Sequence, residues 1–123
     1  MNRKIEIWGR SFVLDVYFDA YDDEIVLDSQ KEALDSFINC ASDILSSYLD
    51  IENYCIDRDG DLIGNSIDNI FKYVMPEQIY IKRSLENRVV ALLCNYRFDE
   101  EHGIALVFED EKLKHIGPQD DVL

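Results

Sequence analysis

The chain has 123 residues, 47% of them apolar, and its 26 acidic against 12 basic side chains give a formal net charge of −14 at pH 7. This length fits a single domain over residues 1–123 with one core, and the apolar content excludes a disordered chain. No apolar run is long enough to cross a bilayer, and the charged residues after Met1 exclude a secretory signal. We therefore expect a cytoplasmic protein, and the three cysteines fit buried thiols in a reducing compartment.

The acidic side chains are concentrated in two segments. Residues 15–28 contain six acids and no base, and residues 99–123 contain eight acids against Lys112 and Lys114. A field of this sign repels phosphate backbones and anionic membranes, so neither nucleic acid nor a membrane is an expected partner. It speeds association with a basic protein. The alternative is that the acidity serves solubility alone.

The N-terminal residues predict two strands. Residues 4–9 form a short strand, and residues 12–18 alternate apolar and polar side chains as a strand with one buried face does. Residues 10–11 are the candidate turn between them. The outer face of the second strand is expected to carry Val13, Asp15 and Tyr17.

The middle of the chain predicts a long helix. Ser29 and Glu32 have the form of a capping box, and apolar residues recur at three- and four-residue steps from Leu34 to Leu49. This pattern indicates an amphipathic helix of five or six turns that bends near Asp50. Residues 25–27 are either a brief strand or the approach to this helix.

A second, shorter helix is expected over residues 66–74, because Ile67, Ile70, Phe71 and Val74 share one face and Pro76 closes the segment. Before it, the acidic residues 57–61 are expected to end the first helix.

The C-terminal third predicts strands again. Residues 79–83 form one, residues 84–87 a polar turn, and residues 88–98 and 104–108 a hairpin in which Gly103 takes a positive φ. Both hairpin strands are apolar on successive residues, so both of their faces should be covered. Residues 112–116 are a candidate last strand.

The order of these elements, ββααβββ, groups the strands apart from the helices. Such an order predicts an α+β fold, with an antiparallel sheet and one long and one short helix packed on one face.

Asp57, Asp59 and Asp61 around Gly60 suggest a calcium loop, but the spacing fails. Such a loop needs glycine at its sixth position and a bidentate glutamate at its twelfth, and no register supplies both. A solvated Asp-Gly turn explains the segment better.

The two histidines, His102 and His115, lack further ligands at a spacing typical of zinc sites. Cys94 and His102 flank the hairpin turn and are a conceivable nucleophile pair. Cys94, however, lies in an apolar strand where a thiol is normally buried with a raised pKa, and the acids beside His102 favour its protonated form.

Motifs for common chemistries are absent from the sequence. It has no phosphate-binding glycine-rich loop, no nucleophile elbow and no basic aromatic platform. We therefore expect no catalytic residue, no metal and no cofactor, and an enzymatic role is less expected than a binding one.

Several segments together resemble a family of small acidic bacterial domains of unknown function, over nearly the whole chain. These segments are residues 12–22, 29–37, 69–76 and 99–120. Their most specific parts are His102–Gly103 and Gly117–Asp120. The resemblance implies no established activity and no catalytic residues. Domains of this kind often look like immunity proteins that neutralise toxins exchanged between bacteria, which is an association and not motif evidence.

The leading hypothesis is a non-enzymatic interaction domain that binds a basic partner protein, as an immunity protein neutralising a basic toxin would. Acidic clusters would steer the partner, and exposed aromatic residues such as Trp8, Tyr17 or Tyr21 would anchor it. The C-terminal residues 117–120 form either a stiff turn or part of this acidic docking face. The candidate partner-binding residues are Tyr21, Asp22, Asp23, Glu24, Asp99, Glu100, Glu101, Glu109, Asp110 and Glu111.

Two alternatives remain open at this stage. One is a small enzyme or ligand-binding domain with a pocket between sheet and helices. The other is a domain that associates with itself through an edge strand or an aromatic face. The sequence identifies neither a partner nor an oligomeric state.

Overall fold

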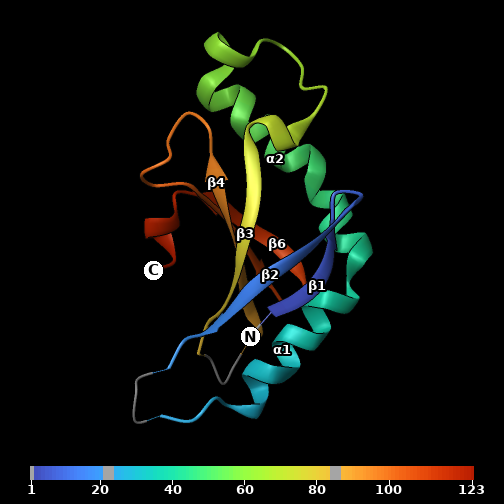
Figure 1. Ribbon diagram of the computed structural model, residues 1–123, viewed down its shortest axis with the longest axis vertical. Coiled ribbons are helices and arrows are strands. Elements are labelled where there is room, and N and C mark those ends of the chain that lie inside the picture. Colours follow the sequence, from blue (N-terminus) through green and yellow to red (C-terminus); the bar gives the residue numbers. More distant parts are fainter. Residues whose placement is uncertain (1, 21–23, 84–86) are drawn as a thin grey trace.

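The computed structural model describes residues 2–20, 24–83 and 87–123, and it confirms the α+β class. Six strands form one sheet in the order β1-β2-β3-β4-β5-β6, and two helices run along one side of it (Figure 1). The elements are β1 (Asn2–Ile7), β2 (Arg10–Phe18), α1 (Asp28–Asn39), α2 (Ala41–Ile63), the 3-10 helix η1 (Ile70–Lys72), β3 (Val74–Ile81), β4 (Val89–Tyr96), β5 (Ile104–Glu109), β6 (Lys112–Gly117) and the 3-10 helix η2 (Gln119–Asp121).

The first hairpin turns at Trp8 and Gly9, two residues earlier than the expected turn at residues 10–11. Both residues have a positive φ, of 50° and 83°, and Ile7 pairs with Arg10. A two-residue loop of this kind matches the twist of the flanking strands. Trp8 is only 6% exposed, and its Nε1 donates a hydrogen bond of 2.9 Å to Ser47 Oγ. The expectation that Trp8 is an exposed anchor is therefore wrong.

One strand pair departs from the expected antiparallel sheet. β2 pairs with β3 in parallel, with Asp15 beside Gln78 and Tyr17 beside Tyr80. Parallel neighbours require a long crossover, and here the chain segment containing α1 and α2 provides it. The other four pairs are antiparallel between consecutive strands.

The predicted long helix is two helices, because Cys40 has non-helical angles (φ −98°, ψ 50°). α1 begins at Asp28, where the Gln30 side chain accepts a hydrogen bond from Leu27 N, so the expected Ser29–Glu32 capping box is not the one used. The amide of the buried Gln30 also donates to the carbonyl oxygens of Asp19 and Ile81. These bonds tie the start of α1 to the ends of β2 and β3.

The break at Cys40 changes which side of α2 faces the sheet. Ile44, Ser47 and Ile51 are at most 1% exposed, whereas Leu45 and Leu49, expected in the core, are 54% and 67% exposed. α2 also continues through residues 57–61 to Ile63, with a kink at Asp59 (φ −130°, ψ 30°), instead of ending there.

The helix expected over residues 66–74 is reduced to η1, and Val74 already belongs to β3. The Asn69 side chain accepts a hydrogen bond from Phe71 N and starts this single turn. Pro76 is accommodated at an irregularity in the β3–β4 register, where a missing N–H is tolerated. Residues 25–27 form no strand.

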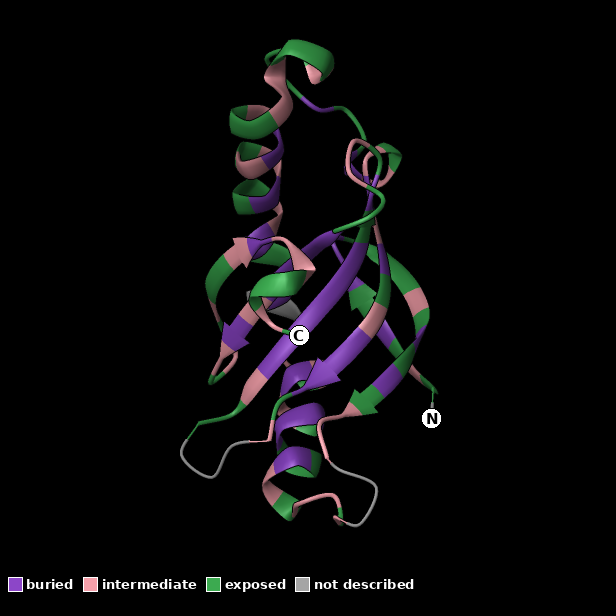
Figure 2. Cartoon of the chain, turned by 90° about the vertical axis from the view of Figure 1, so that its left-hand side faces the viewer, coloured by how far each residue is buried: buried purple, intermediate pink, exposed green. Residues whose placement is uncertain are grey.

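Both faces of β4 are covered, as the sequence predicts. Toward the helices, Leu92 and Tyr96 lie in the main core with Phe37 and Phe108. The opposite face, here called the open face, has a smaller cluster. It consists of Tyr80, Ala91, Leu93 and Ala105, with Val107 and Val122 packed against it. The C-terminal segment lies in front of this face and α1 lies behind the sheet (Figure 2).

Among the described residues, no helix is long and apolar enough to cross a membrane.

Candidate functional site

The two C-terminal acidic clusters lie at opposite ends of β5, because residues 99–101 precede this strand and residues 109–111 follow it. Asp110 and Glu111 have positive φ angles of 48° and 70° and form the two-residue turn between β5 and β6. Arg88 Nε lies 3.0 Å from Glu111 Oε2, and Asn87 Nδ2 donates to Glu109 Oε1 over 2.6 Å. The acids at this end of the sheet are therefore engaged within the chain.

Glu24 lies at the same end of the sheet, and its Oε2 is 3.3 Å from Arg83 Nε. The other candidate residues of this acidic loop, Tyr21, Asp22 and Asp23, lie outside the described residues.

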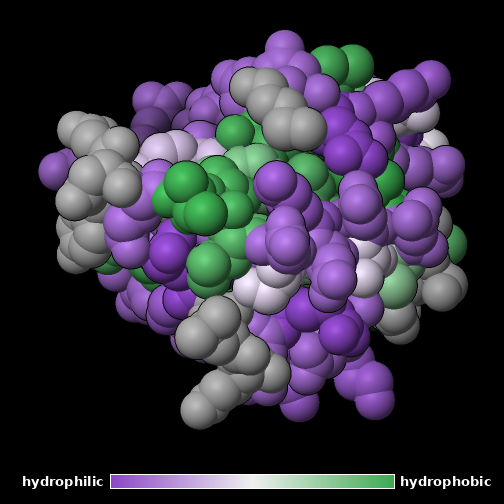
Figure 3. Space-filling model, turned by 90° about the horizontal axis from the view of Figure 1, so that it is seen from below, coloured by the Kyte–Doolittle hydropathy of each residue, from purple (hydrophilic) through white to green (hydrophobic). Residues whose placement is uncertain are grey.

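The lower end of the molecule also carries an apolar area surrounded by polar side chains (Figure 3). Ile25 is 80% exposed, and Phe18, Val26 and Leu34 contribute to a hollow of about 270 Å³.

Asp99 is the most strongly engaged acid of its cluster. Arg58 Nη2 lies 2.6 Å from Asp99 Oδ2, and His102 Nδ1 lies 2.9 Å from Asp99 Oδ1. The Arg58 hydrogen bond, followed by that of His102, lowers the pKa of Asp99 to about 2. The same carboxylate raises the pKa of His102, as its acidic surroundings predict.

Arg58 also joins α2 to β4. Its guanidinium lies 5.2 Å from the centre of the Tyr96 ring, and the Tyr96 hydroxyl donates a 2.5 Å hydrogen bond to Asp59 Oδ2. Burial, together with this hydrogen bond, raises the pKa of Tyr96. Residues 57–61 are therefore part of a folded contact between α2 and β4, not the solvated turn that the sequence suggests.

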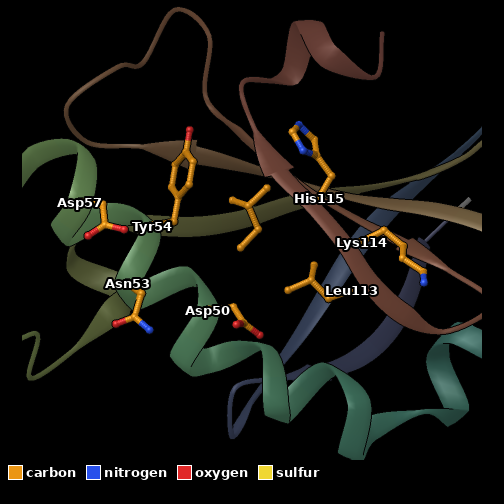
Figure 4. A pocket seen from close by; sticks show the side chains of 8 residues that line it. Asp50, Asn53, Tyr54, Asp57, Leu113, Lys114 and His115 are labelled. Atoms are coloured by element: carbon orange, nitrogen blue, oxygen red, sulfur yellow. The ribbon is translucent and has the colours of Figure 1, made fainter.

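A hollow of about 400 Å³ lies between α2 and β6 and is here called the α2–β6 groove (Figure 4). From β6, Leu113 points toward α2, whereas His115 points toward η2, where its Nε2 lies 2.8 Å from Asp121 Oδ2. The lining residues are Asp50, Asn53, Tyr54, Asp57, Leu113, Lys114, His115 and Ile116.

The exposed acids near this groove differ in their ion pairing from Glu24 and residues 109–111 at the other end of the sheet. Asp50 and Asp57 line the groove from α2, and Glu100 lies in the loop that Arg58 and Asp99 hold against α2. All three are exposed, and within the described part of the chain none of them forms an ion pair. The sequence pointed to Asp57 only as a calcium-loop candidate and did not point to Asp50 as a binding residue, because two acids two helical turns apart come to line one wall only when β6 packs beside them.

A second hollow, of about 420 Å³, lies on the open face. Tyr17 is 47% exposed there, as the alternation in β2 predicts, and it stacks on Tyr80 with ring centres 5.5 Å apart and an angle of 11°. The residues that line it are Tyr17, Gln78, Tyr80, Leu93, Gln119 and Leu123.

The structure brings together the two most specific parts of the resemblance. Gln119 N donates to His102 O over 3.1 Å, and Gln119 Nε2 donates to Cys94 O over 3.0 Å. Gly103, next to His102, faces these groups. The sequence singled out both segments but contained no signal that they touch.

The Cys94/His102 pair is not assembled as a catalytic pair. Cys94 is fully buried, and burial raises the pKa of its thiol, while the His102 ring is exposed and bound to Asp99. Within residues 2–20, 24–83 and 87–123, no group of three or more His, Cys, Asp or Glu side chains is arranged to hold a metal ion.

The fold and surface define a small α+β domain with an acid-lined groove at one sheet edge and an aromatic hollow on its open face. The chain belongs to the family described as Domain of unknown function (DUF6985), whose model matches residues 1–123. No curated protein and no solved structure matches the chain.

Proposed function

We propose that the protein is a non-enzymatic interaction domain that binds a basic partner protein, with the α2–β6 groove and its surrounding acids as the docking surface. The observation that supports this proposal is the exposure of Asp50, Asp57 and Glu100, which form no ion pair within the described chain. Several acids at the β5–β6 turn are paired within the chain, whereas these three are available to cations of another protein.

The groove combines the two elements that protein interfaces use. Its acids attract a basic surface over a distance of about one Debye length, ~8 Å at physiological salt. Tyr54 and Leu113 supply apolar area on which a partner side chain can be buried at the centre. The acids then set the rate of encounter and the apolar centre holds the complex.

Within this class, we favour a basic toxin that the domain neutralises. A toxin that acts on nucleic acid needs a positively charged surface to bind phosphates. An acidic domain covering that surface would block substrate access without any catalysis. This finer assignment draws its support from charge complementarity and from the general association of small acidic domains of this kind with immunity proteins.

The test uses the purified domain as bait in a native lysate of its source cells at low and at high salt. We compare the wild type with Asp50→Asn/Asp57→Asn and with the control Asp28→Asn/Glu32→Gln, which removes the same charge from exposed positions of α1. We expect a basic protein that is captured at low salt. Its purified complex should be weakened about tenfold or more by the groove variant and about twofold or less by the control.

Equal weakening by the two variants would mean that only the net charge matters, which contradicts docking at the groove. Failure to capture any basic protein at low salt would contradict the function itself. If a nuclease is recovered, its activity in the presence of the domain tests neutralisation directly.

A further inference from the structure

β6 is an edge strand, and its outer side is unpaired within the described part of the chain. The sheet order places β6 last, beside β5 alone. In residues 2–20, 24–83 and 87–123, the backbone hydrogen bonds of turns and loops do not involve residues 112–117. An unpaired edge presents N–H and C=O groups to which a further strand can bond.

The register identifies which of these groups point outward. Both central residues of the turn 109–112 have a positive φ, as in a type I′ turn, so its first and last residues form a hydrogen-bonded pair. Bonded and non-bonded pairs alternate along an antiparallel ladder. Phe108 with Leu113 and Leu106 with Ile116 are therefore non-bonded pairs. The backbone N–H and C=O groups of Leu113 and Ile116 consequently point away from β5.

The wall of the α2–β6 groove that stands beside this edge is acidic. Asp50 and Asp57 line it from α2 together with Tyr54, and Leu113 points toward α2 from β6 (Figure 4). The two acids are two helical turns apart, which is about 10 Å along the helix axis. Lys114 lies on the opposite wall, so the acids and the base are on different sides of the groove.

We propose that an extended segment of the basic partner adds to the sheet as a strand along the outer edge of β6, with its basic side chains on the face toward α2. Its main chain bonds to the outward groups of Leu113 and Ile116. Side chains four residues apart on a strand share a face and lie about 13 Å apart. Two bases at this spacing reach Asp50 and Asp57, and the side chain between them packs over Tyr54.

The segment comes from the partner protein, and in this respect the inference rests on the proposed function. A second copy of the chain is disfavoured as the occupant, because two chains with a formal charge of −14 each repel one another. β6 also carries Lys112 and Lys114 and an irregular register opposite Val107 and Phe108, and lysines and bulges oppose pairing between identical edges. Lys112 lies on the face away from α2, since it precedes Leu113 in the strand. Uncharged side chains therefore fit that face of the added segment.

The edge is tested with a synthetic peptide, acetyl-Thr-Lys-Ser-Val-Thr-Arg-Ser-amide, which has its two bases and its valine on one face when it is extended. The peptide is titrated into the isotopically labelled domain, and amide hydrogen exchange is followed by NMR. We expect saturable binding with a Kd of millimolar order. With the peptide at ten times its Kd, exchange of the Leu113 and Ile116 amides should slow about tenfold, because only the free form exchanges. The amides of β1, at the other edge of the sheet, are the control and should be unchanged.

Peptide variants separate strand pairing from attraction by charge. The shuffled peptide acetyl-Thr-Lys-Ser-Val-Arg-Thr-Ser-amide has the same composition but its bases on opposite faces, and it should bind about fivefold more weakly. Two further forms of the first peptide are N-methylated at the even-numbered or at the odd-numbered residues, which blocks one edge each. One form should lose binding and the other should retain it, since a single edge of the peptide faces β6.

Variants of the domain test the acidic wall. Asp50→Asn/Asp57→Asn should weaken binding of the first peptide about tenfold. The control Asp28→Asn/Glu32→Gln removes the same charge from exposed positions of α1 and should weaken it about twofold or less.

Strand addition is refuted by absence of saturable peptide binding, by unchanged exchange of Leu113 and Ile116 in the complex, or by equal binding of the two methylated forms. Exchange at these amides that slows as the concentration of the domain alone rises would instead show that a second copy occupies the edge. A captured basic partner whose complex leaves both amides exchanging as before would refute strand addition and leave the proposed function standing. Peptide pairing with β6 without any basic partner in the lysate would refute the proposed function and leave the edge site.

Discussion

Gln119 donates its side-chain amide to the backbone carbonyl oxygen of Cys94, and Gly103 is the residue that makes room for this bond. A Cβ at Gly103 would lie 2.5 Å from Gln119 Nε2 and 2.6 Å from Cys94 O. The C-terminal segment is therefore fixed to the sheet through a contact that only glycine permits.

Gly103→Ala should destabilise the protein by about 2 kcal/mol or more, because it combines a φ of 59° with this close contact. Gly9→Ala is the matched control, since Gly9 has a φ of 83° but no atom within 4 Å of an added Cβ. Urea denaturation measures both. Equal losses would show that backbone strain alone matters and that the Gln119 contact contributes nothing.

Stability should depend on pH through His102. Its pKa is raised from 6.5 by Asp99, so protonation favours the folded state, and this contribution is present below about pH 6.5 and lost as the pH rises through the folded pKa. We expect wild-type stability, relative to His102→Asn, to fall over that interval. The Asp99 contribution has the opposite sign, since it is present above pH 3.8 and lost as the pH falls toward about 2. Thermal unfolding of both proteins from pH 2 to pH 9 provides the measurement.

Ser47→Ala should destabilise the protein by about 1–2 kcal/mol. The Trp8 indole N–H is buried and donates to Ser47 Oγ, so the substitution leaves a buried donor without its acceptor. Asn53→Ala, at an exposed position of the same helix, should change the free energy of unfolding by less than about 0.5 kcal/mol. A similar effect of the two substitutions would contradict the importance of this bond.

The three thiols should react at different rates with a thiol reagent at pH 8. Cys40 is partly exposed, whereas Cys55 and Cys94 are buried, and burial raises the pKa of Cys55 to about 11. One thiol should therefore be modified in the folded protein and three after unfolding. Rapid modification of Cys55 in the folded state would mean that α2 opens locally beside Tyr96.

The sequence predicts the strands better than the helices. Alternation in β2 and the continuous apolar run in β4 both indicate correctly which faces are covered. The prediction of one continuous helix was wrong at Cys40, because the apolar residues on either side of the break have the spacing of a single helical stripe. Only packing on the sheet decides that Ile44 and Ile51 turn inward while Leu45 and Leu49 do not.

The candidate site was likewise predictable only in part. The number of acids predicts a negatively charged surface, but it does not show that Glu111 pairs with Arg88 while Asp57 lines the groove. Pairing depends on contacts between distant segments, such as Arg58 with Asp99. Tyr17 was identified because its exposure follows from strand alternation alone.

The parallel pairing of β2 with β3 has a consequence for the order of folding. β3 to β6 pair in sequence as neighbours, so this part can form from local contacts. Docking of the β1–β2 hairpin onto β3 instead brings together segments that both helices separate in the sequence. We expect pulsed hydrogen exchange during refolding to protect β4 and β5 before β2. Protection of β2 at the same rate would argue against this order. The β1–β2 hairpin is therefore synthesised before β3 to β6 but takes its place in the sheet after them.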